Sequence, residues 1–195
     1  MPERDKTVAV ILAGGRSSRL GGADKALQPL AGRSLLAHVI ERLTPQVEQL
    51  ALNSNADPER FRTFGLPVIA DVFGDYRGPL AGVHAGLLAF PAARVLTVAV
   101  DLPFLPHDLV ARLARDWDGQ RCRYAACQGQ HRLAILWPPG TAGKVGDWLN
   151  AGQASVHGFL TAHGEPVAFP AADCAALDLN LNTPEAFREA EKHQR

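Results

Sequence analysis

A glycine-rich loop with three basic side chains follows the first apolar run of the chain. Residues 7–12 are apolar or β-branched, and the segment AGGRSSRLGGADK (13–25) that follows them holds four glycines. Its cations are Arg16, Arg19 and Lys25, with Asp24 as the one acid. Glycine lets the backbone approach a ligand closely, and backbone N–H groups beside cations bind anionic oxygens. The residue types and their spacing therefore favour a phosphate-binding loop.

Two common phosphate loops do not match this spacing. The dinucleotide fingerprint G-x-G-x-x-G is absent, because Gly14 is followed directly by Gly15 and the next glycine is Gly21. The G-x-x-x-x-G-K-S/T pattern of a P-loop is absent as well. A flexible turn with solvated charges is the structural alternative. The strand-like run directly before the loop favours the phosphate interpretation.

Three polar side chains follow other predicted strands. Asn53, Asp71 and Asp101 each come directly after an apolar run, and ligands of open α/β sheets bind beyond the carboxyl ends of the strands. A carboxylate at the end of so apolar a run as 95–100 needs a cation, a donor or solvent. Mg²⁺ fits Asp101, because this ion takes one or two carboxylates and completes its shell with water and phosphate oxygens. The alternatives are an Asx turn before Pro103 for Asp101, an exposed loop acid for Asp71 and turn chemistry for Asn53.

The elements that would position these residues alternate between strands and helices. This order predicts an α/β fold with a mostly parallel mixed sheet and helices on both faces. The short link near residues 128–132 indicates one antiparallel pairing. The predicted strands are 7–12, 47–53, 67–70, 94–100, 124–128, 132–137 and 166–169. The predicted helices are 34–44, 58–63, 79–90, 106–117, 140–150, 156–163 and 184–192.

Length and composition predict a single domain over residues 1–195, with flexible ends at 1–6 and 193–195. The chain has 195 residues, of which 47% are hydrophobic, enough for a substantial core. Its 20 basic and 20 acidic side chains cancel, so no overall charge would recruit nucleic acid or an anionic membrane. The three cysteines form no C-x-x-C pair, which predicts reduced, packed thiols and neither a disulfide framework nor a zinc site.

The amino terminus and the hydropathy pattern bear on the location of the protein. Residues 1–6 are polar and charged, and only six residues of strand follow them, so no signal peptide is predicted. No apolar run approaches the ~18 residues of a membrane span. We therefore expect a cytoplasmic protein.

Several motifs of this chain resemble those of one family. The pattern L-A-G-G-x-S-S-R-L-G-G-x-D-K is similar to the nucleotide-binding signature of nucleoside-triphosphate transferases, specifically the molybdenum cofactor guanylyltransferase family. Together the matching motifs cover about residues 7–187. The further motifs are Leu52-Asn53, Asp71, Gly78-Pro79-Leu80-Ala81-Gly82, Val100-Asp101-Leu102-Pro103 and Asn180-Leu181-Asn182-Thr183-Pro184-Glu185.

The resemblance implies a Rossmann-like nucleotidyltransferase that moves GMP from GTP to the terminal phosphate of molybdopterin or Mo-molybdopterin and releases pyrophosphate. The Ala-Gly-Gly form of the loop favours GTP over CTP. Proteins that insert or deliver the molybdenum cofactor are possible partners. The implied GTP-binding residues are Leu12, Ala13, Gly14, Gly15, Lys25, Asn53, Asp71 and Asp101. The implied catalytic charges are Arg19, Lys25 and Asp101, with Mg²⁺ on Asp101.

The acceptor side matches the family less well. Asn180 and Asn182 match, and the resemblance places them near the metal and the molybdopterin phosphate, although both also suit a helix cap. His131-Arg132 stands where the family tends to have a proline, and Ala154-Ser155 stands where it tends to have arginines. Because an anionic acceptor still needs positive charge, Arg132 is the predicted substitute. The open alternatives are another phosphorylated acceptor (a cofactor or a sugar phosphate), CTP as donor, or a nucleotide-binding delivery protein without catalysis.

Overall fold

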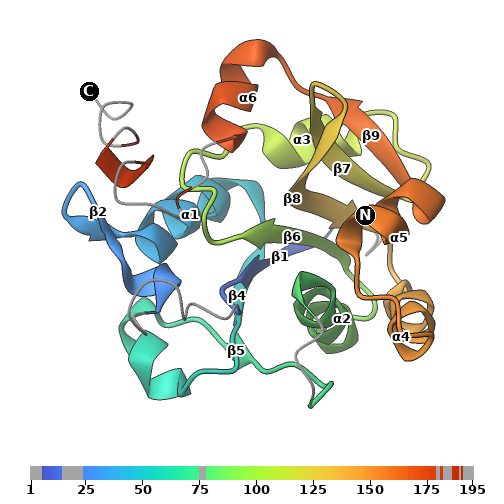
Figure 1. Cartoon of the computed structure of the whole chain (residues 1–195), viewed down its shortest axis with the longest axis horizontal. Coiled ribbons are helices and arrows are strands. Elements are labelled where there is room, and N and C mark those ends of the chain that lie inside the picture. Colours follow the sequence, from blue (N-terminus) through green and yellow to red (C-terminus); the bar gives the residue numbers. More distant parts are fainter. Residues whose placement is uncertain are drawn as a thin grey trace.

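A seven-stranded sheet forms the centre of the protein (Figure 1). The computed structural model describes residues 6–14, 24–74, 78–178, 181, 186–188 and 190. The strand order is β5-β4-β1-β6-β8-β7-β9. The strands are β1 (Thr7–Leu12), β4 (Gln49–Asn53), β5 (Val68–Ile69), β6 (Arg94–Ala99), β7 (Cys122–Cys127), β8 (Gln130–Trp137) and β9 (Gly164–Ala168).

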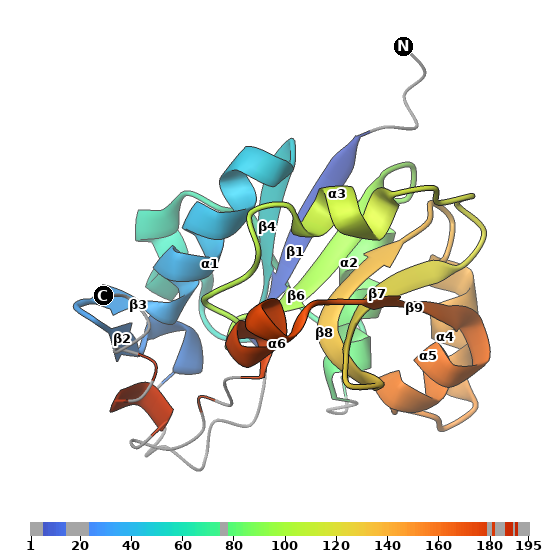
Figure 2. The same cartoon turned by 90° about the horizontal axis from the view of Figure 1, so that it is seen from above.

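The sheet is mixed, as the sequence predicts. Strand β8 runs antiparallel to β6 and β7, and the other pairings are parallel. The β7–β8 link consists of Gln128 and Gly129, whose φ angles of 51° and 78° are those of a two-residue hairpin turn. Seen from above in Figure 2, β1, β4 and β6 run side by side in one direction. Their carboxyl ends consequently share one edge of the sheet.

Helices cover both faces of the sheet, which confirms the expected α/β architecture (Figure 1). Strand β1 shows the two-sided burial, because Ala9 and Ile11 pack into one apolar core and Val10 and Leu12 into the other. In the part of the chain that is described, no helix is long and apolar enough to cross a membrane. One face carries α1 (Leu35–Leu43), α3 (Leu109–Ala114) and α6 (Ala171–Leu177). The other carries α2 (Pro79–Ala89), α4 (Ala142–Asn150) and α5 (Val156–His163).

Several elements differ from the sequence-based expectation. Helix α3 is shorter than the predicted 106–117, and α6 was not predicted because its alanine-rich segment has no clear apolar stripe. A small antiparallel pair, β2 (Pro29–Leu30) and β3 (Arg33–Ser34), was also missed. Most of the predicted helix 184–192 lies outside the described residues, although 186–188 and 190 are helical.

The prediction of three reduced cysteines is wrong. Cys127 at the end of β7 and Cys174 in α6 form a disulfide, and only Cys122 is a free thiol. The Cα atoms of the pair are 5.4 Å apart, a separation that suits a disulfide. The two residues are 47 positions apart, so the pairing depends on α6, which the sequence did not reveal.

Candidate active site

The polar residues that follow four strands lie together at one edge of the sheet. In the pairing register Leu12 of β1 lies beside both Asn53 of β4 and Ala99 of β6. The strands therefore end at the same level. The loop that begins at Ala13, the side chain of Asn53 and the residues just after β5 and β6 meet there, as ligand-binding groups do in open α/β sheets.

Lys25 and Asp101 form the central charge pair of this edge. Lys25 Nζ lies 2.8 Å from Asp101 Oδ2, and the two side chains are 17% and 31% exposed. The two residues are 76 positions apart and reach the same point from the ends of β1 and β6. The predicted cation and the predicted carboxylate are thus in direct contact. Arg19 and Gly15, also predicted for this loop, lie outside the described residues.

A short 3₁₀ helix, η3 (Lys25–Leu27), sets the position of Lys25. Its N-cap is Asp24, whose carboxylate accepts a hydrogen bond from the backbone N–H of Ala26 at 3.1 Å. The other carboxylate oxygen of Asp24 lies 3.9 Å from Nη1 of Arg60 in η5 (Pro58–Phe64). Asp24 is buried, and its two carboxylate oxygens interact with the Ala26 N–H and with Arg60. These contacts fix the start of η3 and with it the position of Lys25 at the edge.

A second cluster of polar side chains at this edge consists of Asn53, Asn55 and Asp71. The Asn53 side-chain amide donates to the Ile69 carbonyl at 3.1 Å and to Asp71 Oδ1 at 2.9 Å. The Asn55 amide donates to Asp71 Oδ2 at 2.8 Å, and its oxygen accepts from the Asp71 backbone N–H at 2.8 Å. Both oxygens of the Asp71 carboxylate are therefore fixed. Asn55 was not predicted as a site residue. Its only signal in the sequence is the turn-forming pattern Asn-Ser-Asn that it shares with Asn53.

Helix α2 approaches this polar cluster through a glycine. A Cβ atom added to Gly82 would lie 2.1 Å from Asn53 Oδ1, far closer than atoms pack. On the other side, a Cβ on Gly14 would lie 3.5 Å from the same oxygen, an ordinary contact. The Gly-Pro-Leu-Ala-Gly motif thus has a structural reason: its last glycine makes room for the buried Asn53 side chain.

A cavity of about 330 Å³ opens beside Asp101. Asp101, His131, Arg132 and Asp178 supply its ionisable side chains. Arg132 is ion-paired with Asp178, so its charge is not free as the sequence suggested. His131 Nδ1 lies 3.4 Å from Nδ1 of His157, and burial, then His157 and Arg132, lower the pKa of His131. Asn180 and Asn182, predicted near this place, lie outside the described residues.

The donor chemistry of the edge fits a magnesium ion that is held together with phosphate. No group of three or more His, Cys, Asp or Glu side chains that could enclose a metal exists among the residues the structure describes. Asp101 offers a single hard carboxylate on an open edge. Mg²⁺ commonly binds through one or two carboxylates, substrate phosphates and water, whereas a structural zinc needs a closed set of ligands.

Comparison with known proteins assigns the family. The family model described as a MobA-like NTP transferase domain matches residues 9–186. The chain belongs to this family. The match includes the edge formed by β1, β4, β5 and β6 and the cavity beside Asp101. Membership in the MobA-like NTP transferase family makes the protein an enzyme of the nucleotidyltransferase class.

Individual relatives agree with this family. A molybdenum cofactor guanylyltransferase of Cereibacter sphaeroides is 46% identical over 187 residues, covering 93% of this chain and 94% of the relative. The crystal structure of molybdopterin-guanine dinucleotide biosynthesis protein A from Archaeoglobus fulgidus has a TM-score of 0.74 at 20% identity, covering 96% and 98% of the two chains. Rv0371C of Mycobacterium tuberculosis, solved in complex with manganese, has a TM-score of 0.68 at 16% identity and covers 97% and 99%.

Proposed function

We propose that this protein transfers GMP from GTP to the terminal phosphate of molybdopterin or Mo-molybdopterin and releases pyrophosphate. The product is the guanine dinucleotide form of the molybdenum cofactor. The observation that carries the proposal is the contact between Lys25 and Asp101 at the edge where β1 and β6 end. The relative from Cereibacter sphaeroides, which matches nearly the whole chain, supports the choice of donor and acceptor. We further propose that residues 1–195 act as one domain.

The reaction requires positioning and charge neutralisation more than acid–base catalysis. An oxygen of the acceptor phosphate forms a bond to the α-phosphorus of GTP, and the bond from that phosphorus to the bridging oxygen of the β-phosphate breaks. Pyrophosphate leaves with the electron pair. Because the attacking phosphate is already anionic near neutral pH, no general base is needed.

Lys25, Asp101 and Arg19 are the proposed charges of the reaction. Lys25 would place its ammonium group against the triphosphate, and Asp101 would hold Mg²⁺, which would supply positive charge to offset the charge that develops on the phosphates. The solved manganese complex of a protein with the same fold agrees with a divalent cation. The Lys25–Asp101 contact keeps both groups at the edge and compensates each charge by the other.

The guanine would lie against Leu12, Ala13 and Gly14, with Gly15 toward the phosphates. The Ala13 backbone N–H donates to the Asn53 carbonyl at 2.9 Å, so the start of the loop is tied to β4. Asp71, oriented by Asn53 and Asn55, is a proposed nucleotide contact. A carboxylate is a strong acceptor, and guanine offers N–H donors that cytosine arranges differently.

The acceptor would occupy the cavity beside Asp101, with Arg132, Asn180 and Asn182 as the proposed contacts to its phosphate. Asp101 and Arg132 line the same cavity, which supports a phosphate placed between donor and acceptor sides. Delivery proteins as partners and a cytoplasmic location stay predictions.

Pyrophosphate release tests donor, acceptor and activity together. With Mg²⁺ and molybdopterin present, we expect release from GTP and at least about tenfold less from CTP or ATP, since unpaired polar groups at a base-reading site penalise the wrong base. Omitting molybdopterin should stop release. Release that is independent of molybdopterin, or that needs a sugar phosphate instead, would identify another acceptor. GTP binding without any release would indicate a delivery protein.

Arg132→Ala should weaken acceptor binding at least about tenfold and change GTP affinity less than about threefold, because a charge-assisted hydrogen bond to phosphate is lost. Asp178→Asn is the matched control, since it breaks the same ion pair but leaves the cation in the cavity. Titration of GTP and of the acceptor against both variants distinguishes a phosphate contact made by Arg132 from its ion pair with Asp178. If the variants weaken acceptor binding equally, Arg132 serves only as the partner of Asp178.

A further inference from the structure

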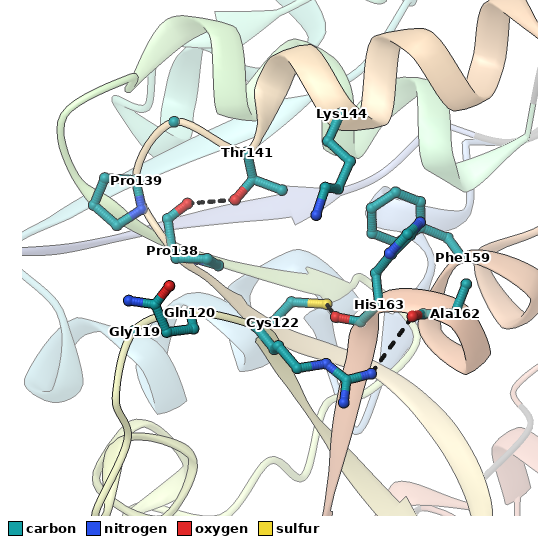
Figure 3. Close-up of a pocket in the computed structure, with 12 residues that line it drawn as sticks. Gly119, Gln120, Cys122, Pro138, Pro139, Thr141, Lys144, Phe159, Ala162 and His163 are labelled. Carbon is teal, nitrogen blue, oxygen red and sulfur yellow. Dashed lines mark hydrogen bonds between the residues drawn. The ribbon is translucent and has the colours of Figure 1, made fainter.

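A second cavity lies where β7 begins and β8 ends, whereas the cavity beside Asp101 lies where β8 begins. Figure 3 shows the residues that line this second cavity. Its volume is about 310 Å³, and it is formed around the start of β7, the turn after β8, the start of α4 and the end of α5. Strand β7, with six residues, runs from the second cavity toward the cavity beside Asp101. At ~3.3 Å per residue the two cavities are about 20 Å apart. Nothing in the proposed guanylyl transfer uses this region.

Three basic side chains line the second cavity without a matching acid. Arg121, Lys144 and His163 line it, and no carboxylate belongs to its described lining residues. Neither Lys144 nor Arg121 forms an ion pair within the described part of the chain; Arg121 makes one long hydrogen bond of 3.5 Å to the Ala162 carbonyl. In Figure 3 the Lys144 side chain extends from its helix toward the space between Thr141 and His163.

The three basic groups are close enough to influence one another. The pKa of His163 is lowered, first by burial and then by the charges of Lys144 and Arg121. Glu165, the acid that follows on β9, is occupied by Arg123 at 3.2 Å. The positive charge of the cavity therefore comes from Arg121 and Lys144, with no carboxylate among the described lining residues, which favours an anionic ligand.

The start of α4 adds backbone donors to this charge. Its N-cap residue Thr141 makes no capping hydrogen bond, and its hydroxyl donates to the Pro138 carbonyl at 2.7 Å. Uncapped N–H groups in the first turn of a helix bind phosphate oxygens well. Lys144 belongs to this first turn, so the backbone donors and the ammonium group serve the same cavity.

The remaining lining residues are not reactive. The free thiol of Cys122 lies in the floor of the cavity, and burial raises its pKa to about 12, so the thiol is neutral at physiological pH. Phe159 and the pair Pro138-Pro139 supply apolar walls. Such a lining suits binding rather than nucleophilic chemistry.

We infer that this cavity is a second anion-binding site, separate from the nucleotide edge, which takes the phosphate or diphosphate group of a small molecule. Arg121, Lys144 and the first turn of α4 hold the oxygens of that group. The volume of about 310 Å³ accommodates a diphosphate with room for an attached group.

Pyrophosphate and inorganic phosphate are the probes for this site. Titration is followed by ¹H–¹⁵N NMR with EDTA present, so that no divalent metal supports binding at Asp101. We expect saturable shifts of the amides at the start of α4, and Lys144→Met and Arg121→Gln should each raise the Kd of that site at least about tenfold. Guanylyl transfer at saturating substrates should be unchanged in both variants.

Two further variants locate the binding. Lys25→Met removes the cation of the nucleotide edge and should leave the α4 shifts and their Kd intact. Lys6→Met removes an exposed lysine that does not line the cavity and controls for overall charge. The inference is wrong if the α4 amides do not shift, if Lys25→Met abolishes the shifts, or if Lys6→Met weakens binding as much as Lys144→Met. Because binding is read without catalysis, these outcomes do not depend on the proposed function.

Discussion

Asp101→Asn should lower the turnover of GTP at least about a hundredfold, the scale at which losing one electrostatic group impairs catalysis, while the protein stays folded. Asparagine keeps the shape of the side chain but removes the charge that binds Lys25 and would hold Mg²⁺. The Asp101 side chain is 31% exposed, so losing this charge should cost little stability.

Steady-state pyrophosphate release and Mn²⁺ titration monitored by electron paramagnetic resonance measure the two effects of Asp101→Asn. Asp108→Asn is a suitable control, because Asp108 forms a 2.7 Å ion pair with Arg112 and neither residue lines either cavity. We expect the control to keep wild-type turnover. If Asp101→Asn also keeps wild-type turnover and metal affinity, Asp101 is a turn residue, and the proposed metal site is wrong.

Gly82→Ala should lower the free energy of unfolding by about 2–3 kcal/mol, because overpacking a filled core forces side chains or backbone to move. The new methyl carbon would lie 2.1 Å from Asn53 Oδ1 and 3.2 Å from a methyl group of Leu12. Asn53 is 2% exposed and is held by Ile69 and Asp71, so it cannot move away without losing its hydrogen bonds. We therefore expect GTP affinity to fall as well.

Urea denaturation compares this variant with Gly143→Ala. Gly143 is also a helical glycine, but a Cβ there would meet nothing within 4 Å. The control should gain up to ~1 kcal/mol from the better helix propensity of alanine. Equal stability of the two variants would show that α2 or Asn53 adjusts freely and that the close packing is unimportant.

The sequence by itself determined the order of the seven strands of the main sheet and the edge at which the polar residues gather. The apolar run 95–100 identifies its strand, and Asp101 follows directly, so its place at a strand end is a local property. The glycines and cations of the loop after β1 predicted phosphate chemistry for the same reason. Motifs of this kind depend on neighbours in the sequence and need no long-range information.

Only the tertiary structure decided which groups touch. The Lys25–Asp101 contact joins residues 76 positions apart, and the Arg132–Asp178 pair and the Cys127–Cys174 disulfide depend on how α6 and its carboxyl end pack beside β7 and β8. The role of Gly82 was visible only once α2 lay against Asn53. The second cavity combines the starts of β7 and α4 with the end of α5. Side-chain periodicity shows which face of an element is buried, but the pairing of distant polar groups is fixed only when the elements pack together.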